Sequence, residues 1–205
     1  MRVLLATAPI ALLLLLATPG LAQDSPWELR LLPSEESWLL ADAADVNVAG
    51  DVVGQYAESK PDESRPVLWR NGAWIDLGLA YGQPDGWLWG WASCINDAGL
   101  AGGAMVSSRT GTPQAHAVVW DTIAGTWTDR NPTELGNVDS AIDAMNEVGD
   151  YAGRVWLEDG SFGAYFWDRN GVGNRMFDVP EGYDYAQISD LNDSGWAVGA
   201  AATLW

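Results

Sequence analysis

The stretch Ile95-Asn96-Asp97-Ala98-Gly99-Leu100-Ala101-Gly102-Gly103 decides the fold, because its spelling returns three more times. Each copy reads apolar-Asn-x-x-Gly-x-x-x-Gly. The other copies are Val46-Asn47-Val48-Ala49-Gly50 with Gly54, Met145-Asn146-Glu147-Val148-Gly149 with Gly153, and Leu191-Asn192-Asp193-Ser194-Gly195 with Gly199. The asparagines are 49, 50 and 46 residues apart, and such a period is typical of a repeat built from one small β-sheet.

Each copy predicts a tight hairpin turn. The asparagine takes position i of a type I turn, where its side chain accepts from a backbone amide two residues on. The first glycine takes position i+3, where a left-handed conformation costs little. The second glycine falls in the return strand, and glycine there marks a bulge or a close backbone approach. Its fourfold recurrence leads us to expect that neighbouring sheets press together at this point.

A second signature, an apolar run that ends on tryptophan, follows in three of the units. Its copies are Arg65-Pro66-Val67-Leu68-Trp69, His116-Ala117-Val118-Val119-Trp120 and Gly163-Ala164-Tyr165-Phe166-Trp167. A turn then leads into Trp74-Ile75-Asp76-Leu77, Trp127-Thr128-Asp129 or Met176-Phe177-Asp178-Val179. These segments predict a second hairpin, so one unit contains about four short strands, the content of one propeller blade.

The two signatures together resemble the HAF family of bacterial extracellular repeats. His116-Ala117-Val118 matches the triplet that names the family, with Val118 in place of phenylalanine, whereas the other units carry Arg65-Pro66 and Gly163-Ala164. The resemblance covers about residues 27 to 205. It implies an exported, β-propeller-like repeat protein, and it brings no catalytic residues and no established ligand.

We therefore predict an all-β, β-propeller-like fold with about four blades of short antiparallel strands, of which the last is incomplete. The units cover about residues 34–78, 83–131, 134–179 and 183–205 of a domain that spans 23–205. From Gly199 to Trp205 there are 6 residues, against 15, 17 and 14 between the matching glycine and tryptophan of earlier units. Either a strand around Trp27 docks beside the fourth sheet and closes a small ring, or the chain is part of a longer array and leaves an open edge.

Residues 1–22 have the pattern of a secretory signal peptide, with Arg2, a short apolar run and small residues before a cut at Gln23. This predicts a secreted, extracellular or periplasmic protein without a membrane span once the signal is removed. The remaining chain carries nine basic and 28 acidic residues, a formal charge of −19. Such a surface argues against nucleic acid as a partner. The expected partner is an unidentified extracellular ligand, either a glycan or a protein.

The residues that most often carry chemistry are scarce. Cys94 is the only cysteine and reads as a small strand residue, and His116 is the only histidine and starts a repeated strand. Asp190-Leu191-Asn192-Asp193-Ser194-Gly195 matches the first half of a calcium loop, but Ala201 stands where the bidentate glutamate belongs. We predict no metal site, no cofactor and no catalytic residue.

The chain has 13 tryptophans, and most of them occupy repeat positions that predict packing between units. In Gly86-Trp87-Leu88-Trp89-Gly90-Trp91, strand alternation would put Trp87, Trp89 and Trp91 on one side, as a candidate ligand-binding row. We predict a binding or interaction module. One alternative is a carbohydrate-binding propeller that uses these rings. Another is a hydrolase or lyase with carboxylates from Asp42, Asp139, Asp143 and Asp190 at the ring mouth.

Overall fold

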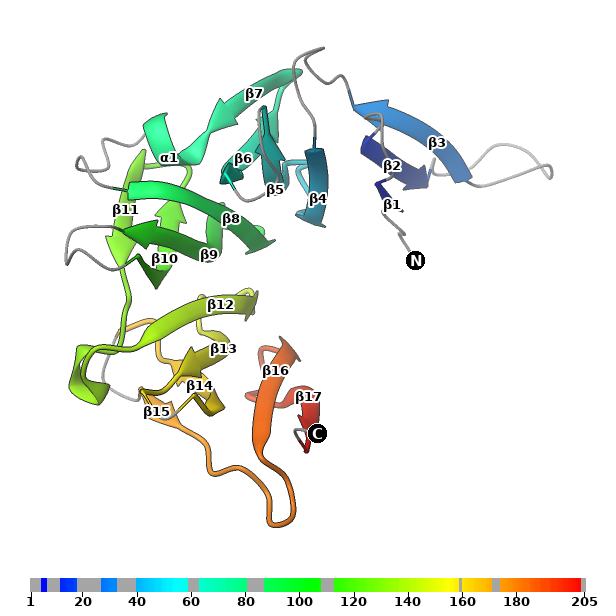
Figure 1. The fold of residues 1–205 in the computed structure, drawn as a ribbon. Coiled ribbons are helices and arrows are strands. Elements are labelled where there is room, and N and C mark those ends of the chain that lie inside the picture. Colours follow the sequence, from blue (N-terminus) through cyan, green and yellow to red (C-terminus); the bar gives the residue numbers. More distant parts are fainter. Residues whose placement is uncertain are drawn as a thin grey trace.

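The computed structural model describes residues 5–6, 12–17, 27–32, 40–58, 63–80, 87–107, 113–158, 160–170 and 174–203. In these residues the chain forms five antiparallel sheets (Figure 1). The predicted all-β fold is therefore confirmed. No helix in the described part of the chain has the length and hydrophobicity that crossing a membrane requires.

Four of the sheets are the predicted repeat units. Unit 1 consists of β4 (Leu40–Val46), β5 (Val52–Ala57), β6 (Arg65–Arg70) and β7 (Ala73–Asp76), followed by the one-turn helix α1 (Leu77–Ala80). Unit 2 consists of β8 (Trp87–Ile95), β9 (Leu100–Ser107), β10 (Gln114–Asp121) and β11 (Thr126–Asp129), and the short 3-10 helix η2 (Thr133–Leu135) follows it. Unit 3 consists of β12 (Asp139–Met145), β13 (Tyr151–Trp156), β14 (Phe162–Trp167) and β15 (Arg175–Met176). Unit 4 contains two described strands, β16 (Tyr185–Leu191) and β17 (Ala197–Ala202).

Neighbouring strands in the chain are also neighbours in each sheet. The four units follow one another in an arc, and their first strands, β4, β8, β12 and β16, lie on its inner side (Figure 1). Four strands in each of the first three units agree with the sequence prediction, as does a fourth unit without a second hairpin.

The amino-terminal strands form a separate sheet beside unit 1. It contains β1 (Leu5–Ala6), β2 (Leu12–Ala17) and β3 (Trp27–Leu32), and β3 pairs along its whole length with β2. The strand around Trp27 therefore does not dock beside the fourth sheet in this structure. Leu32 at its end is 3% exposed and packs against Val52 of unit 1. The predicted cut at Gln23 lies outside the described residues.

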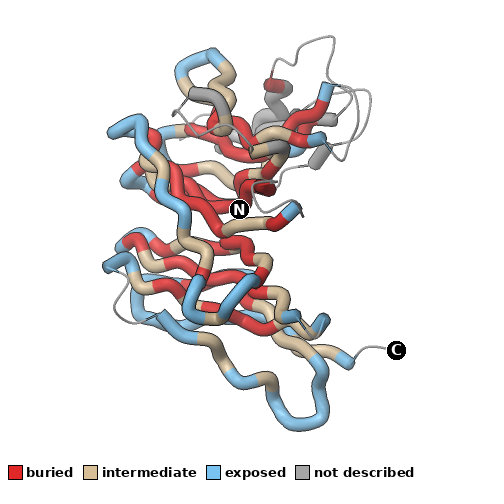
Figure 2. Tube along the Cα trace, turned by 60° about the vertical axis from the view of Figure 1, so that its left-hand side comes forward, coloured by how far each residue is buried: buried red, intermediate tan, exposed pale blue. Residues whose placement is uncertain are grey.

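The predicted packing of the repeated tryptophans between units is confirmed for two of them. Trp120 of unit 2 is fully buried in a cluster that includes Val53 and Leu68 of unit 1. Trp167 of unit 3 is 1% exposed and packs with Ala117 and Val119 of unit 2. Buried residues therefore run through the stacked sheets, while the turns are exposed (Figure 2).

The second glycine of the repeat allows a close backbone contact between two strands of the same sheet. This corrects the expectation that neighbouring sheets press together at that position. Each first strand has a β-bulge three residues before its asparagine, as between Ile142 and Ala144. A Cβ atom on Gly153 would lie 2.1 Å from the carbonyl oxygen of Ala141, just before that bulge. The same close approach recurs at the matching glycines, with distances of 1.8 Å at Gly54, 2.1 Å at Gly103 and 1.9 Å at Gly199. Glycine is needed because the bulge brings two backbones of one sheet together.

Candidate functional site

The repeated asparagine-glycine corners form a continuous ladder from unit to unit. Asn47 donates from Nδ2 to the main-chain oxygen of Asn96, and this bond recurs from Asn96 to Asn146 and from Asn146 to Asn192, each at 3.2 Å. A second set runs from a backbone N–H to the carboxylate that follows the next asparagine. Its members are Val48 to Asp97 at 2.8 Å, Asp97 to Glu147 at 2.7 Å and Glu147 to Asp193 at 2.8 Å.

Within each corner the asparagine also fixes its own turn. The main-chain bond from glycine back to asparagine is present in all four turns, and each first glycine has a positive φ between 79° and 87°. The side-chain oxygen accepts from the amide four residues on, as from Leu100 to Asn96 at 2.9 Å. An acceptor bond from the amide two residues on was predicted, and among the described corners it occurs at Asn192, from Ser194. Asn96 thus holds both its own turn and the next corner, and it is 1% exposed.

The three candidate tryptophans do not form one row. A bulge between Trp87 and Trp89 shifts the register of β8 by one residue, so Trp87 faces the opposite side from the other two. Trp87 packs edge-on against Trp127 and His116, at ring distances of 5.8 and 5.3 Å, and joins the cluster between units 1 and 2. Trp89 and Trp91 stack on each other at 5.9 Å, and both are half-buried.

His116 takes part in a repeated cross-strand pair. Its Nδ1 lies 2.8 Å from a carboxylate oxygen of Asp129 on β11. In unit 1 the same two positions hold Arg65 and Asp76, whose charged atoms are 3.3 Å apart. The pair therefore connects the Trp-x-Asp strand to its neighbour in both units, which indicates a structural role for the single histidine.

The four carboxylates of the enzyme alternative lie on the first strands of units 1, 3 and 4, and Asp139, Asp143 and Asp190 have different bonding partners. Asp42 is exposed on β4, and Asp190 accepts from the amide of Leu191 at 2.8 Å. Asp143 pairs with Arg154 at 3.1 Å. Burial raises the pKa of Asp143 to about 6, although the Arg154 guanidinium opposes this rise. Asp139 is the single one of the four that lines a described cleft.

The side chains of Cys94 and Asn192 form hydrogen bonds with backbone atoms. The thiol of Cys94 is buried and points at the carbonyl oxygen of Gly102 at 3.8 Å, and burial raises the pKa of this thiol, so the reactive thiolate is disfavoured. The side-chain oxygen of Asn192 accepts from the amides of Ser194 and Trp196, both at 3.0 Å. Within the calcium-like hexapeptide, Asn192 thus stabilises the turn, and Asp193 accepts from the amide of Glu147 in unit 3.

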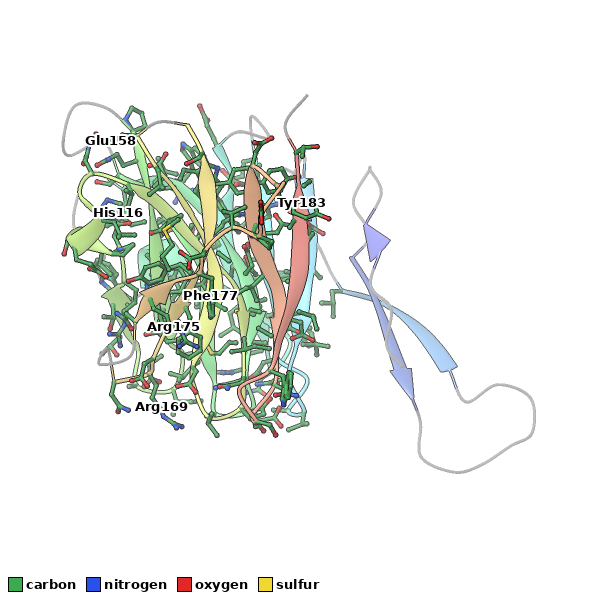
Figure 3. All side chains as sticks on the ribbon, turned by 90° about the horizontal axis from the view of Figure 1, so that it is seen from below. His116, Glu158, Arg169, Arg175, Phe177 and Tyr183 are labelled. Carbon is green, nitrogen blue, oxygen red and sulfur yellow. The ribbon has the colours of Figure 1, made fainter. Side chains whose placement is uncertain are left out.

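An open cleft of about 210 Å³ lies between units 2 and 3. Its lining consists of Pro113, Gln114, Asn137, Asp139, Trp156, Leu157 and Glu158. Glu158 lies at the end of the sheets away from Arg169, which binds the main-chain oxygen of Val148 in the third corner (Figure 3). The cleft is therefore at the opposite end of the molecule from the ladder of corners.

The half-buried indole of Trp156 is the apolar wall of this cleft. The guanidinium of Arg154 lies 5.2 Å from its ring centroid, and Phe162 packs beside it at 6.3 Å. Phe162 in turn contacts Tyr185 of unit 4 at 4.2 Å. Asp139 is held by a bond from the amide of Ala115 to one oxygen at 2.9 Å. The Trp156 ring, which carries the Arg154 guanidinium over it, thus lines the cleft together with carboxylate and amide groups, a combination that can bind polar ligands with an apolar side.

The sequence singled out Trp87, Trp89 and Trp91 and missed the cleft. A signal for Trp156 did exist, because it is outside the repeated tryptophan columns. Comparison with protein-family models gave no match, and a search of curated proteins gave none either.

Proposed function

We propose that this is an exported, β-propeller-like binding module of the HAF type that holds a neutral glycan in the cleft beside Trp156. The observation that carries the proposal is the pairing of a half-buried indole with Asp139, Gln114 and Glu158 in one open cleft. The arc of similar units with their first strands inside supports the propeller-like architecture. The signal-like residues 1–22 support export.

The chemistry of the cleft fits a sugar ring. One face of a pyranose is apolar and stacks on an indole, while its hydroxyl groups donate to carboxylate and amide oxygens. Two acids in the lining, Asp139 and Glu158, disfavour anionic sugars. The site thus selects neutral, hydroxyl-rich ligands.

Retention on neutral glycans tests the proposal. The full chain is applied to an array of neutral and sialylated oligosaccharides, and the best neutral ligand is titrated against three variants. Trp156→Ala removes the aromatic wall and should weaken binding at least about tenfold, the order expected when a stacked aromatic contact is lost. Trp156→Phe keeps a ring and should retain most of the affinity.

Trp196→Ala is the matched control, because Trp196 is 74% exposed on unit 4 and is not part of the cleft. It should bind as the unmodified chain does. Equal retention by Trp156→Ala would contradict the proposal, provided that its thermal unfolding stays cooperative. Loss of binding in Trp89→Ala alone would instead assign the ligand to the stacked pair Trp89 and Trp91.

A further inference from the structure

Unit 4 carries the same two hydrogen-bond donors, the asparagine side-chain amide and the next backbone amide, that units 1 to 3 use to bind the following unit. The first three asparagines each donate from Nδ2 to the next corner, whereas Asn192 has no such partner among the described residues. The amides of Val48, Asp97 and Glu147 each donate to a carboxylate of the next corner, and for the amide of Asp193 the described part of the chain contains no such acceptor. In units 1 to 3 both donors bond toward the following unit.

Asp190 repeats this pattern on the inner strand. In unit 1, Asp45 accepts the amide of Val46 with Oδ1 at 2.8 Å and the amide of Ile95 in unit 2 with Oδ2 at 2.9 Å. Asp190 occupies the matching position and accepts the amide of Leu191 with Oδ1. Its Oδ2, which would receive the next unit, has no donor among the described residues.

The apolar residue that packs against the following unit in earlier units is also exposed on unit 4. Val53 and Ala152, six residues after their asparagines, are 1% and 0% exposed because the following unit covers them. Val198 at the matching position is 65% exposed. An apolar patch beside unused hydrogen-bond donors is typical of a docking surface.

Unit 1 does not fit this surface, whether from the same chain or from a second copy. The incoming corner must present a carboxylate to the amide of Asp193, and unit 1 has Val48 where units 2, 3 and 4 have Asp97, Glu147 and Asp193. Its receiving face is also covered, because Leu32 packs on Val52. The occupant therefore has to be a unit whose asparagine is followed by an acid.

We propose that the β16–β17 face, together with Asn192 Nδ2, the Asp193 amide and Asp190 Oδ2, binds one further repeat unit of this type, held in tandem. Its corner reads apolar-Asn-Asp/Glu-x-Gly. The support is continuity with an interface that the chain already forms: the bonds from the asparagine Nδ2 and from the following amide occur three times, and the aspartate Oδ2 bond occurs once, from the amide of Ile95 to Asp45.

A fusion tests the assignment. A copy of unit 3, residues 134–182, is joined after Trp205, and amide hydrogen exchange is compared with that of the chain alone. Docking should slow the exchange of β17 amides by about tenfold or more, because they change from an open to a covered sheet. Asn192→Asp keeps the oxygen that accepts from the amides of Ser194 and Trp196 but removes the Nδ2 donor, so it should abolish most of that gain in the fusion and leave the exchange of the unextended chain nearly unchanged.

The copied unit supplies the second control. Replacing its acid after asparagine by valine, the change equivalent to Glu147→Val, should reduce the gain in protection, and a Gln at that position should reduce it less. A gain that survives both Asn192→Asp and the valine replacement would overturn the proposal. So would the absence of any gain, since docking is what would fold the added unit. A dimer of the unextended chain that Val198→Asp dissociates would assign the face to a second copy instead.

Discussion

At Gly153 a single methyl group is enough to disturb the sheet. An alanine Cβ would lie 2.1 Å from the Ala141 oxygen and 2.9 Å from the Asp143 nitrogen, and both are backbone atoms that cannot rotate away. We expect Gly153→Ala to lower the free energy of unfolding by about 3 kcal/mol. Gly160→Ala is the control, because Gly160 has a positive φ of 83° in open space and should cost about 1 kcal/mol. Urea unfolding measures both, and equal losses would contradict the bulge argument.

Asp143 makes a second prediction at this scale, in the dependence of stability on pH. Burial raises its pKa from 3.8 to about 6 in the folded chain, so the folded state binds the proton more tightly than the unfolded state. Its contribution to stability is therefore complete below the ordinary value and is lost as pH rises through about 6. Asp143→Asn should remove this part of the profile. The unfolding free energies of both proteins are measured from pH 4 to 7, and parallel profiles would contradict the prediction.

Strands β10 and β11 indicate that a side chain from one unit can replace the side chain at the matching position of another unit. His116 and Asp129 occupy the positions of Arg65 and Asp76 in unit 1. We therefore expect His116→Arg to change stability by at most about 0.5 kcal/mol. Met105→Arg, at the register partner of His116 on β9, is the control and should be severely destabilising because Met105 is 4% exposed. Loss of folding in His116→Arg would show that the histidine has a role of its own.

Much of each element followed from the sequence, because the deciding interactions are local. The asparagine-glycine turns, the paired strands and the tryptophans between units all depend on residues a few positions apart or on their repetition. The side on which Trp87 lies did not follow, since one bulge between Trp87 and Trp89 reverses it. The forward bond of Asn96 and the cleft beside Trp156 depend on neighbouring units, and no spacing within one unit specifies them.

Over the whole molecule, protection should follow the number of neighbours that a unit has. Unit 2 contributes to the apolar clusters on both of its sides, whereas β17 is exposed over its first four residues. Unit 3 likewise packs on units 2 and 4, so we expect amides of β9, β10, β13 and β14 to exchange most slowly and those of β16 and β17 to exchange fastest among the four units. Native-state hydrogen exchange with peptide-level mass analysis measures this order. Uniform exchange across the units would indicate a single cooperative structure instead.

The direction of the asparagine ladder bears on how such a chain grows and shrinks over evolution. The side-chain amides of Asn47, Asn96 and Asn146 each donate to the next corner along the chain, so each of these junctions joins a side-chain nitrogen of one unit to the same main-chain oxygen of its successor. A duplicated or deleted stretch of one whole period rejoins donor to acceptor without any other substitution. Changes of half a period leave both sides mismatched, so length variation among descendants of this sequence should come in whole multiples of the repeat.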